Sequence, residues 1–178
     1  MFNLTNKMQK KKNHPIIQFS TINWDLNDTN IKNPAYVDHD WHSNPVLLLY
    51  KTEIKDFLNI IHQLDWYGKL WEWEDDEGKS FDKLERIIGE WNSGKNLSPI
   101  EIFPQDNNHA VIKSGNHRFT ILYNAYKQQQ LQQKELYFLI PQESNICDTN
   151  DPSKTVKVDC KKWIANKIIA TFVKEIYK

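Results

Sequence analysis

Apolar residues recur every three or four positions in three segments, and this spacing predicts amphipathic helices. The first segment is Glu53–Leu64, where Thr52 is a candidate cap. The second runs from Ser80, also a candidate cap, to Gly94, where the helix should end. The third is Lys161–Tyr177. Their apolar faces are, in order, Ile54, Phe57, Leu58 and Ile61; Phe81, Leu84, Ile87, Ile88 and Trp91; and Ile164, Ile168, Ile169, Phe172 and Ile176.

Extended segments separate the second and third helices. Pro99 and Pro104 bound an apolar run over Ile100–Phe103. The polar cluster Asp106–Asn108 predicts a hairpin connection to a second strand, Ala110–Ile112. Together with the helices, these strands predict an α+β domain.

The segment Val111–Leu122 combines an apolar strand, a glycine turn and the start of a helix. A glycine lets the backbone turn and approach a ligand closely, and the N–H groups that begin the next helix attract negative charge. Arg118 adds a fork of donors suited to phosphate or carboxylate, and His117 adds a group that titrates near neutral pH. The segment therefore predicts an anion-binding turn whose phosphate-binding residues are Ser114, Gly115, Asn116, His117 and Arg118.

A purely structural interpretation of the turn stays open. In that interpretation Gly115 only turns the chain, and Asn116 caps a helix that continues through Phe119–Gln128. His117 and Arg118 would then be solvated residues of the first helical turn.

The region from Phe81 to Pro141 resembles the ParB/sulfiredoxin-like domain. In that domain a helix ending in glycine, a Pro-Ile strand, a second strand, a Gly-x-His-Arg turn, a helix and a final strand follow one another. The corresponding pieces here are Leu84–Gly94, Ser98–Phe103, His109–Ile112, Ser114–Arg118, Phe119–Gln128 and Glu135–Ile140. The resemblance implies a small mixed sheet flanked by helices, with an N-terminal extension and a C-terminal helix.

The resemblance implies different activities in different branches of the family. Sulfiredoxins share the glycine, histidine and arginine of the turn but place their catalytic cysteine where this chain has Asn116. Partition proteins bind CTP and continue into a DNA-binding region, for which too few residues follow Pro141. A branch resembling free-serine kinases and ParB-like nucleases has an acidic residue where this chain has Ser114. Serine there removes a carboxylate that could bind magnesium or act as a base.

The leading hypothesis is a nucleotide- or phosphate-binding protein, with phosphoryl transfer or phosphodiester cleavage as the implied chemistry. The ligand would be ATP or another nucleotide with Mg²⁺, or a phosphorylated small molecule. His117 and Arg118 are the candidate catalytic residues: Arg118 would neutralise charge growing on the phosphate, and His117 would orient it or move a proton. A base or metal ligand would come from Asp38, Asp40 or His42, in a polar stretch that shows no full set of zinc ligands.

Two rival hypotheses come from other classes of protein. The first is a non-catalytic interaction protein, such as an immunity protein, an inhibitor or a phage adaptor. Its Trp71–Glu77 segment would meet a basic partner, although alternating Trp and Glu also predict a half-buried strand before an acidic loop. The second is DNA binding, because residues 154–178 contain seven lysines and only two acidic residues, Asp159 and Glu175. It ranks last, since Lys plus Arg equal Asp plus Glu at 23 each and the net charge is zero.

The 178 residues suit one domain with extensions. We expect an N-terminal extension over residues 1–50, the ParB/sulfiredoxin-like domain over 51–145, and a C-terminal helical extension over 146–178, all in one globular unit. Cys147 and Cys160 are expected to be free thiols in a reducing compartment. No apolar run reaches the roughly 20 residues that span a bilayer, so a cytoplasmic protein without membrane contact is expected.

Overall fold

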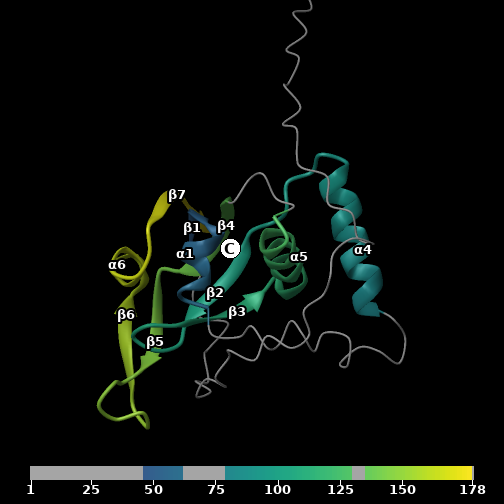
Figure 1. Ribbon diagram of the computed structural model, residues 1–178. Helices are drawn as coiled ribbons and strands as arrows, with labels where there is room; N and C mark the ends of the chain where they lie inside the picture. The colour runs from purple at the N-terminus through teal and green to yellow at the C-terminus, as the bar shows by residue number, and fades with distance from the viewer. Residues whose placement is uncertain (1–45, 62–78, 130–134, 178) are drawn as a thin grey trace, which may run out of the picture.

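Helices pack on a five-stranded sheet, and a two-stranded hairpin extends beyond it (Figure 1). This computed structural model describes residues 46–61, 79–129 and 135–177. The elements follow in the order β1 (Val46–Glu53), α1 (Ile54–Leu58), α4 (Lys79–Asn92), β2 (Ile100–Pro104), β3 (Ala110–Ser114), α5 (Asn116–Lys127), β4 (Glu135–Pro141), β5 (Glu143–Cys147), β6 (Thr155–Asp159), α6 (Cys160–Ala165) and β7 (Ala170–Tyr177).

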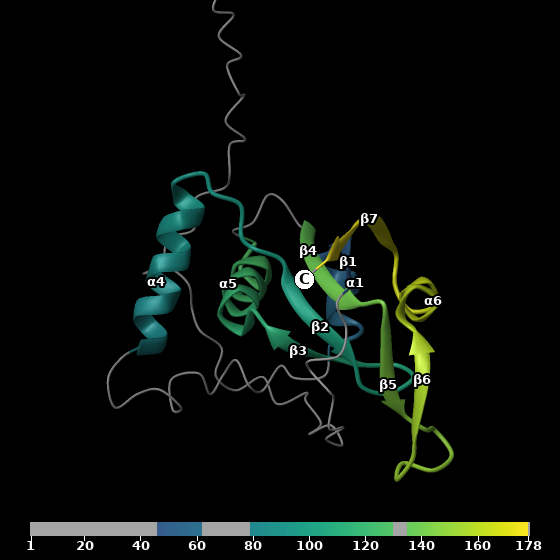
Figure 2. The ribbon, with the colours of Figure 1, turned by 180° about the vertical axis from the view of Figure 1, so that it is seen from behind.

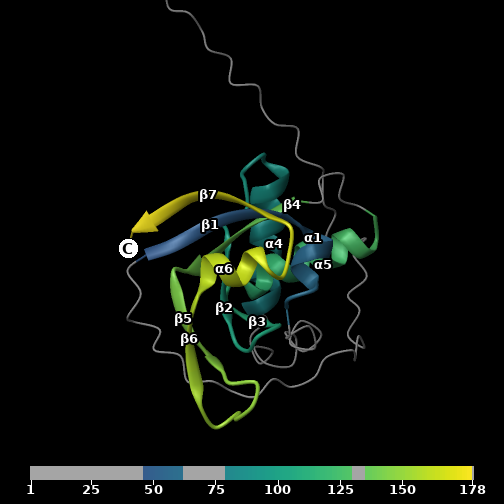
Figure 3. The same cartoon turned by 90° about the vertical axis from the view of Figure 1, so that its left-hand side faces the viewer.

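The main sheet is mixed, with the strand order β3-β2-β4-β1-β7. Strands β2 and β4 are parallel, and the other neighbouring pairs are antiparallel. Figure 3 shows β7 running beside β1 along one edge of the sheet. The fold class is therefore α+β, as the sequence predicts.

An aromatic cluster joins the helices to one face of the sheet. The rings of Phe57 on α1 and Phe119 on α5 have centroids 5.4 Å apart, and Phe57 lies 5.5 Å from Phe138 on β4. All three side chains are fully buried, and each contributes about 1.5–3 kcal/mol by leaving water. Helix α5 lies between α4 and the sheet (Figure 2).

The second predicted helix and the predicted hairpin are confirmed. Helix α4 contains Ser80 instead of beginning after it, and the chain leaves the helix through Gly94, whose φ of 88° suits glycine. Strands β2 and β3 pair antiparallel across the connection that contains Asp106–Asn108. Each helix in the described part of the chain is too short or too polar to cross a bilayer.

The first predicted helix is much shorter than its apolar spacing indicates. Helix α1 ends at Leu58, and Ile61 forms an isolated bridge with Ala110 instead. Thr52 is not a cap: it belongs to β1, and its hydroxyl donates to the carbonyl of Ile169 at 2.8 Å. The pairing of neighbouring segments thus overrides the helical pattern.

The predicted terminal helix is wrong. Helix α6 covers only Cys160–Ala165, and the chain continues as β7, which pairs with β1 over most of its length. The run Ala170–Tyr177 is rich in β-branched and aromatic residues, which favour strands. The described lysines of residues 154–177 consequently lie on β6, α6, β7 and their connections and do not share one helix face.

Candidate anion-binding site

The turn between β3 and α5 is built from a short hairpin and a glycine. The Asp106 carboxylate accepts hydrogen bonds from the backbone N–H groups of Asn108 and His109 at 2.7 and 2.8 Å, which closes the hairpin connection. The imidazole Nδ1 of His109 lies 3.1 Å from Oδ1 of Asp106. His109 is partly buried, although its position in the hairpin favours exposure. Strand β3 then ends at Ser114, and Gly115 turns the backbone into α5.

Gly115 is the residue that begins the helix. It is the N-cap of α5, with φ 102° and ψ 22° in the left-handed region, and no side chain caps the helix. The expected cap at Asn116 is therefore wrong, since Asn116 is already the first helical residue. The N–H groups of a first helical turn have no acceptor within the helix, so the turn directs backbone donors outward.

The Arg118 side chain folds back over Gly115. A Cβ atom placed on Gly115 would lie 2.8 Å from Nη2 and 3.1 Å from Nε of Arg118. The guanidinium therefore lies beside the backbone donors of the turn, which combines a fixed positive charge with the helix N-terminus. Burial lowers the pKa of Arg118, and the negative charge of Glu101 acts in the opposite direction.

A carboxylate reaches the turn from the neighbouring strand. Glu101 on β2 pairs with Ser114 in the ladder and is largely buried. Its Oε1 lies 3.2 Å from Nζ of Lys113, which in turn lies 5.0 Å above the ring of Phe103. With Arg118 and Lys113 positive and Glu101 negative, these three side chains sum to a charge of +1.

Of the remaining residues of the predicted turn, Ser114 ends β3, and Asn116 and His117 begin α5. Ser114 is exposed, and His117 and Asn116 are partly buried. The Asn116 carbonyl accepts a hydrogen bond from the Thr120 hydroxyl at 2.8 Å. Its side-chain Oδ1 is buried and has no hydrogen-bond partner among the described residues. The five residues of the predicted site are consecutive, so they lie together in the turn whatever its function.

Other predicted site residues lie outside the described ranges. These are Asp38, Asp40 and His42, and also the Trp71–Glu77 segment. In the described part of the chain, no three or more His, Cys, Asp or Glu side chains gather as a metal site.

Two residues of the site are absent from the prediction made on the sequence. Glu101 and Lys113 come from β2 and β3, and neither belongs to the turn motif. Their proximity follows from the hairpin register, in which Pro104 pairs with Ala110 and Phe103 with Val111. Counting along both strands from the Asp106–Asn108 connection would have placed Glu101 opposite Lys113, and the register shift between Glu101 and Ile102 moves its ladder partner to Ser114. Comparison with protein-family models, curated proteins and solved structures finds no match.

Proposed function

We propose that this protein binds the phosphate of a nucleotide or of a phosphorylated small molecule at the Ser114–Arg118 turn. One observation carries the proposal: the Arg118 guanidinium lies against Gly115, at the N-terminus of the twelve-residue helix α5. A phosphate there would accept hydrogen bonds from backbone N–H groups and from a planar fork of donors. The charge sum of +1 at the turn favours an anion.

The ParB/sulfiredoxin-like fold is part of the same proposal. Its support is the order of the elements: α4, β2, β3, the glycine turn, α5 and β4. This is the order that the resemblance implies for residues 81–141.

Binding is tested by isothermal titration calorimetry with sodium pyrophosphate and with ATP, each with and without Mg²⁺. Arg118→Ala should lower the affinity by roughly 10- to 100-fold, because a hydrogen bond to a charged group contributes about 1.5–3 kcal/mol. Arg86→Ala is the matched control, since Arg86 is an exposed α4 residue whose Nη1 lies 3.8 Å from Glu90. It removes the same charge and should leave the affinity unchanged. Equal affinities in wild type and Arg118→Ala would remove the turn from the binding site.

We also infer that Glu101 is the candidate base if the bound phosphate reacts. The motif has Ser114 where the related branch has an acid, and Glu101 supplies a carboxylate directly across the ladder from that position. Glu101→Gln keeps the shape of the side chain and removes its charge. Phosphate binding should therefore strengthen, because the charge sum rises from +1 to +2, while any turnover of ATP should fall. Unchanged turnover with stronger binding would show that Glu101 only sets the charge of the turn.

A further inference from the structure

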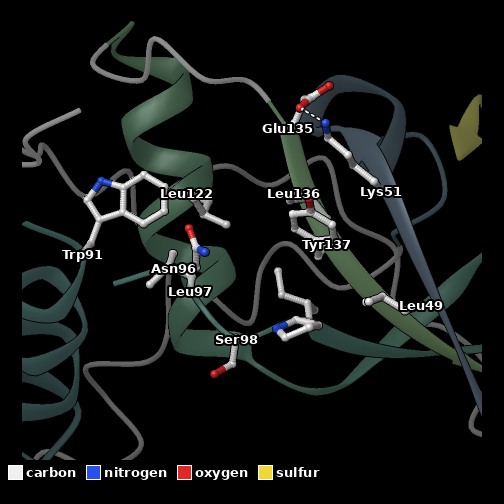
Figure 4. A pocket seen from close by; sticks show the side chains of 12 residues that line it. Leu49, Lys51, Trp91, Asn96, Leu97, Ser98, Leu122, Glu135, Leu136 and Tyr137 are labelled. Carbon is white, nitrogen blue, oxygen red and sulfur yellow. Dashed lines mark ion pairs between the residues drawn. The ribbon is translucent and has the colours of Figure 1, made fainter. Parts of the chain in front are cut away.

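A cavity of about 280 Å³ opens where β2 and β4 begin, close to the turn (Figure 4). Its lining comes from both faces of the sheet. Leu136 and Ile100 belong to the core face, whereas Leu49, Lys51 and Tyr137 belong to the opposite face. The cavity therefore lies at a gap between strands and is not a groove over one face.

The gap follows from the register of the two parallel strands. Strand β2 begins at Ile100, which pairs with Phe138, but β4 begins three residues earlier, at Glu135. Alternate residues of a strand direct their N–H and C=O groups to the same edge. At least one of residues 135–137 therefore directs both its N–H and its C=O group toward the cavity, on a side where no described strand pairs with it. No backbone hydrogen bond from the described loop before β2 reaches these residues.

The side chains around this strand edge suit a flat, uncharged ring system. Figure 4 shows Trp91 and Tyr137 on either side of Asn96. The Asn96 amide and the Ser98 hydroxyl can each donate or accept a hydrogen bond, and Leu97 adds apolar surface. Aromatic side chains offer stacking surfaces. The edge of β4 at residues 135–137, where no other described strand pairs with it, offers a donor and an acceptor side by side, which is the pattern of a heterocyclic base edge.

The charges at the cavity cancel. Lys51 Nζ and Glu135 Oε2 are 2.6 Å apart, and both line the cavity. Because the two charges are already paired, the cavity favours a ligand group that is uncharged and leaves this ion pair intact. The volume lies just below the range of roughly 300–1,000 Å³ that is usual for drug-sized ligands, so it suits one small heterocycle.

The cavity and the anion-binding turn lie at the same end of the sheet. Pro99 lines the cavity and is two residues before Glu101, a separation of about 7 Å along a strand. Glu101 lies opposite Ser114, and neighbouring strands are about 5 Å apart. We propose that the cavity takes the base of a nucleotide whose phosphates lie on the Ser114–Arg118 turn, a proposal that rests on the proposed function.

The test uses equilibrium dialysis of the full chain with ATP, CTP, GTP, UTP and pyrophosphate. Ser98 lies in the exposed loop before β2 and lines the cavity, so Ser98→Trp should fill it. Ser93→Trp is the matched control, because Ser93 lies in the same loop and does not line the cavity. We expect one nucleotide to bind wild type at least 10-fold more tightly than pyrophosphate. Ser98→Trp should reduce its affinity to that of pyrophosphate and leave pyrophosphate binding unchanged, whereas Ser93→Trp should change neither.

The two proposals fail in different ways. If pyrophosphate binds and depends on Arg118, but Ser98→Trp binds every nucleotide as wild type does, the base site is refuted and the phosphate site stands. The same holds if no nucleotide binds more tightly than pyrophosphate. If neither pyrophosphate nor any nucleotide binds wild type, the phosphate site is refuted, and the base site with it.

Discussion

Two glycine-to-alanine substitutions should change stability in opposite directions. Gly115 has φ 102°, and a Cβ atom there would lie 2.8 Å from Nη2 of Arg118. Gly89 lies in the interior of α4, is exposed, and a Cβ atom there would meet nothing within 4 Å. The chemical change is identical, so the difference isolates the backbone conformation and the contact with Arg118.

The expected sizes follow from the geometry. An L-residue in the left-handed region costs roughly 1–2 kcal/mol, so Gly115→Ala should lower the free energy of unfolding by about that amount. The contact adds less, because the guanidinium is the end of a flexible side chain and can move away. Gly89→Ala should raise the free energy of unfolding by about 0.5–1 kcal/mol, since alanine loses less conformational entropy in a helix. Thermal midpoints should change by about 2–4 °C per kcal/mol.

Urea unfolding at pH 7, followed by tryptophan fluorescence and far-ultraviolet circular dichroism, measures both changes. The slope of the free energy of unfolding against urea concentration should be the same in both variants as in wild type. An unchanged slope would show that only stability has changed. Pyrophosphate affinity should also fall in Gly115→Ala, because moving the guanidinium displaces its donors, and should stay unchanged in Gly89→Ala. A Gly115→Ala variant as stable as wild type would show that this turn does not need a glycine.

Four other outcomes test the packing of the described residues. Asp159→Ala should cost about 0.5–2 kcal/mol in urea unfolding, because the Asp159 carboxylate accepts from two backbone N–H groups at the start of α6. Phe138→Ala should cost about 3–5 kcal/mol by the same measurement, since this ring is fully buried between two aromatic neighbours. A thiol-exchange reagent at pH 8 should modify Cys147 but not the buried Cys160 in the folded protein, and both in denaturant; Cys147→Ser should abolish the native signal. Burial raises the pKa of Cys160 from 9.0 to about 12. The stability that the buried neutral thiol contributes should therefore be complete below pH 9 and be lost as the pH rises from 9 to 12. Cys160→Ala should abolish this pH dependence.

The hairpin and the turn could be predicted because their signals are local. Pro99 and Pro104 bound β2, and the Asp106 carboxylate organises the connection through hydrogen bonds to residues two and three positions later. Gly115 follows β3 directly. Each of these features depends on a few adjacent residues, so the sequence alone indicates them.

The end of the chain could not be predicted in the same way. The apolar residues at Ile164, Ile168 and Phe172 fit a helix, but β7 exists because β1 offers it an edge far away in the sequence. Tyr50 on β1 lies opposite Phe172, with ring centroids 5.5 Å apart, and stacks on Phe138 on its other side. Such long-range pairing outweighs helical spacing and leaves only a short helix between two strands.

Glu101 changes what the motif implies about chemistry. The sequence motif places Ser114 where the branch that it resembles carries an acid, which argues against catalysis when the turn is considered alone. In the fold, the neighbouring strand brings a carboxylate across from Ser114, and Lys113 lies 3.2 Å from it. Because Lys113 offsets that negative charge, the positive charge of Arg118 remains available to a phosphate. A serine in the motif is thus compatible both with anion binding and with a nearby base. Turnover of ATP by wild type decides between a binding protein and an enzyme, and Glu101→Gln then decides whether Glu101 is the base.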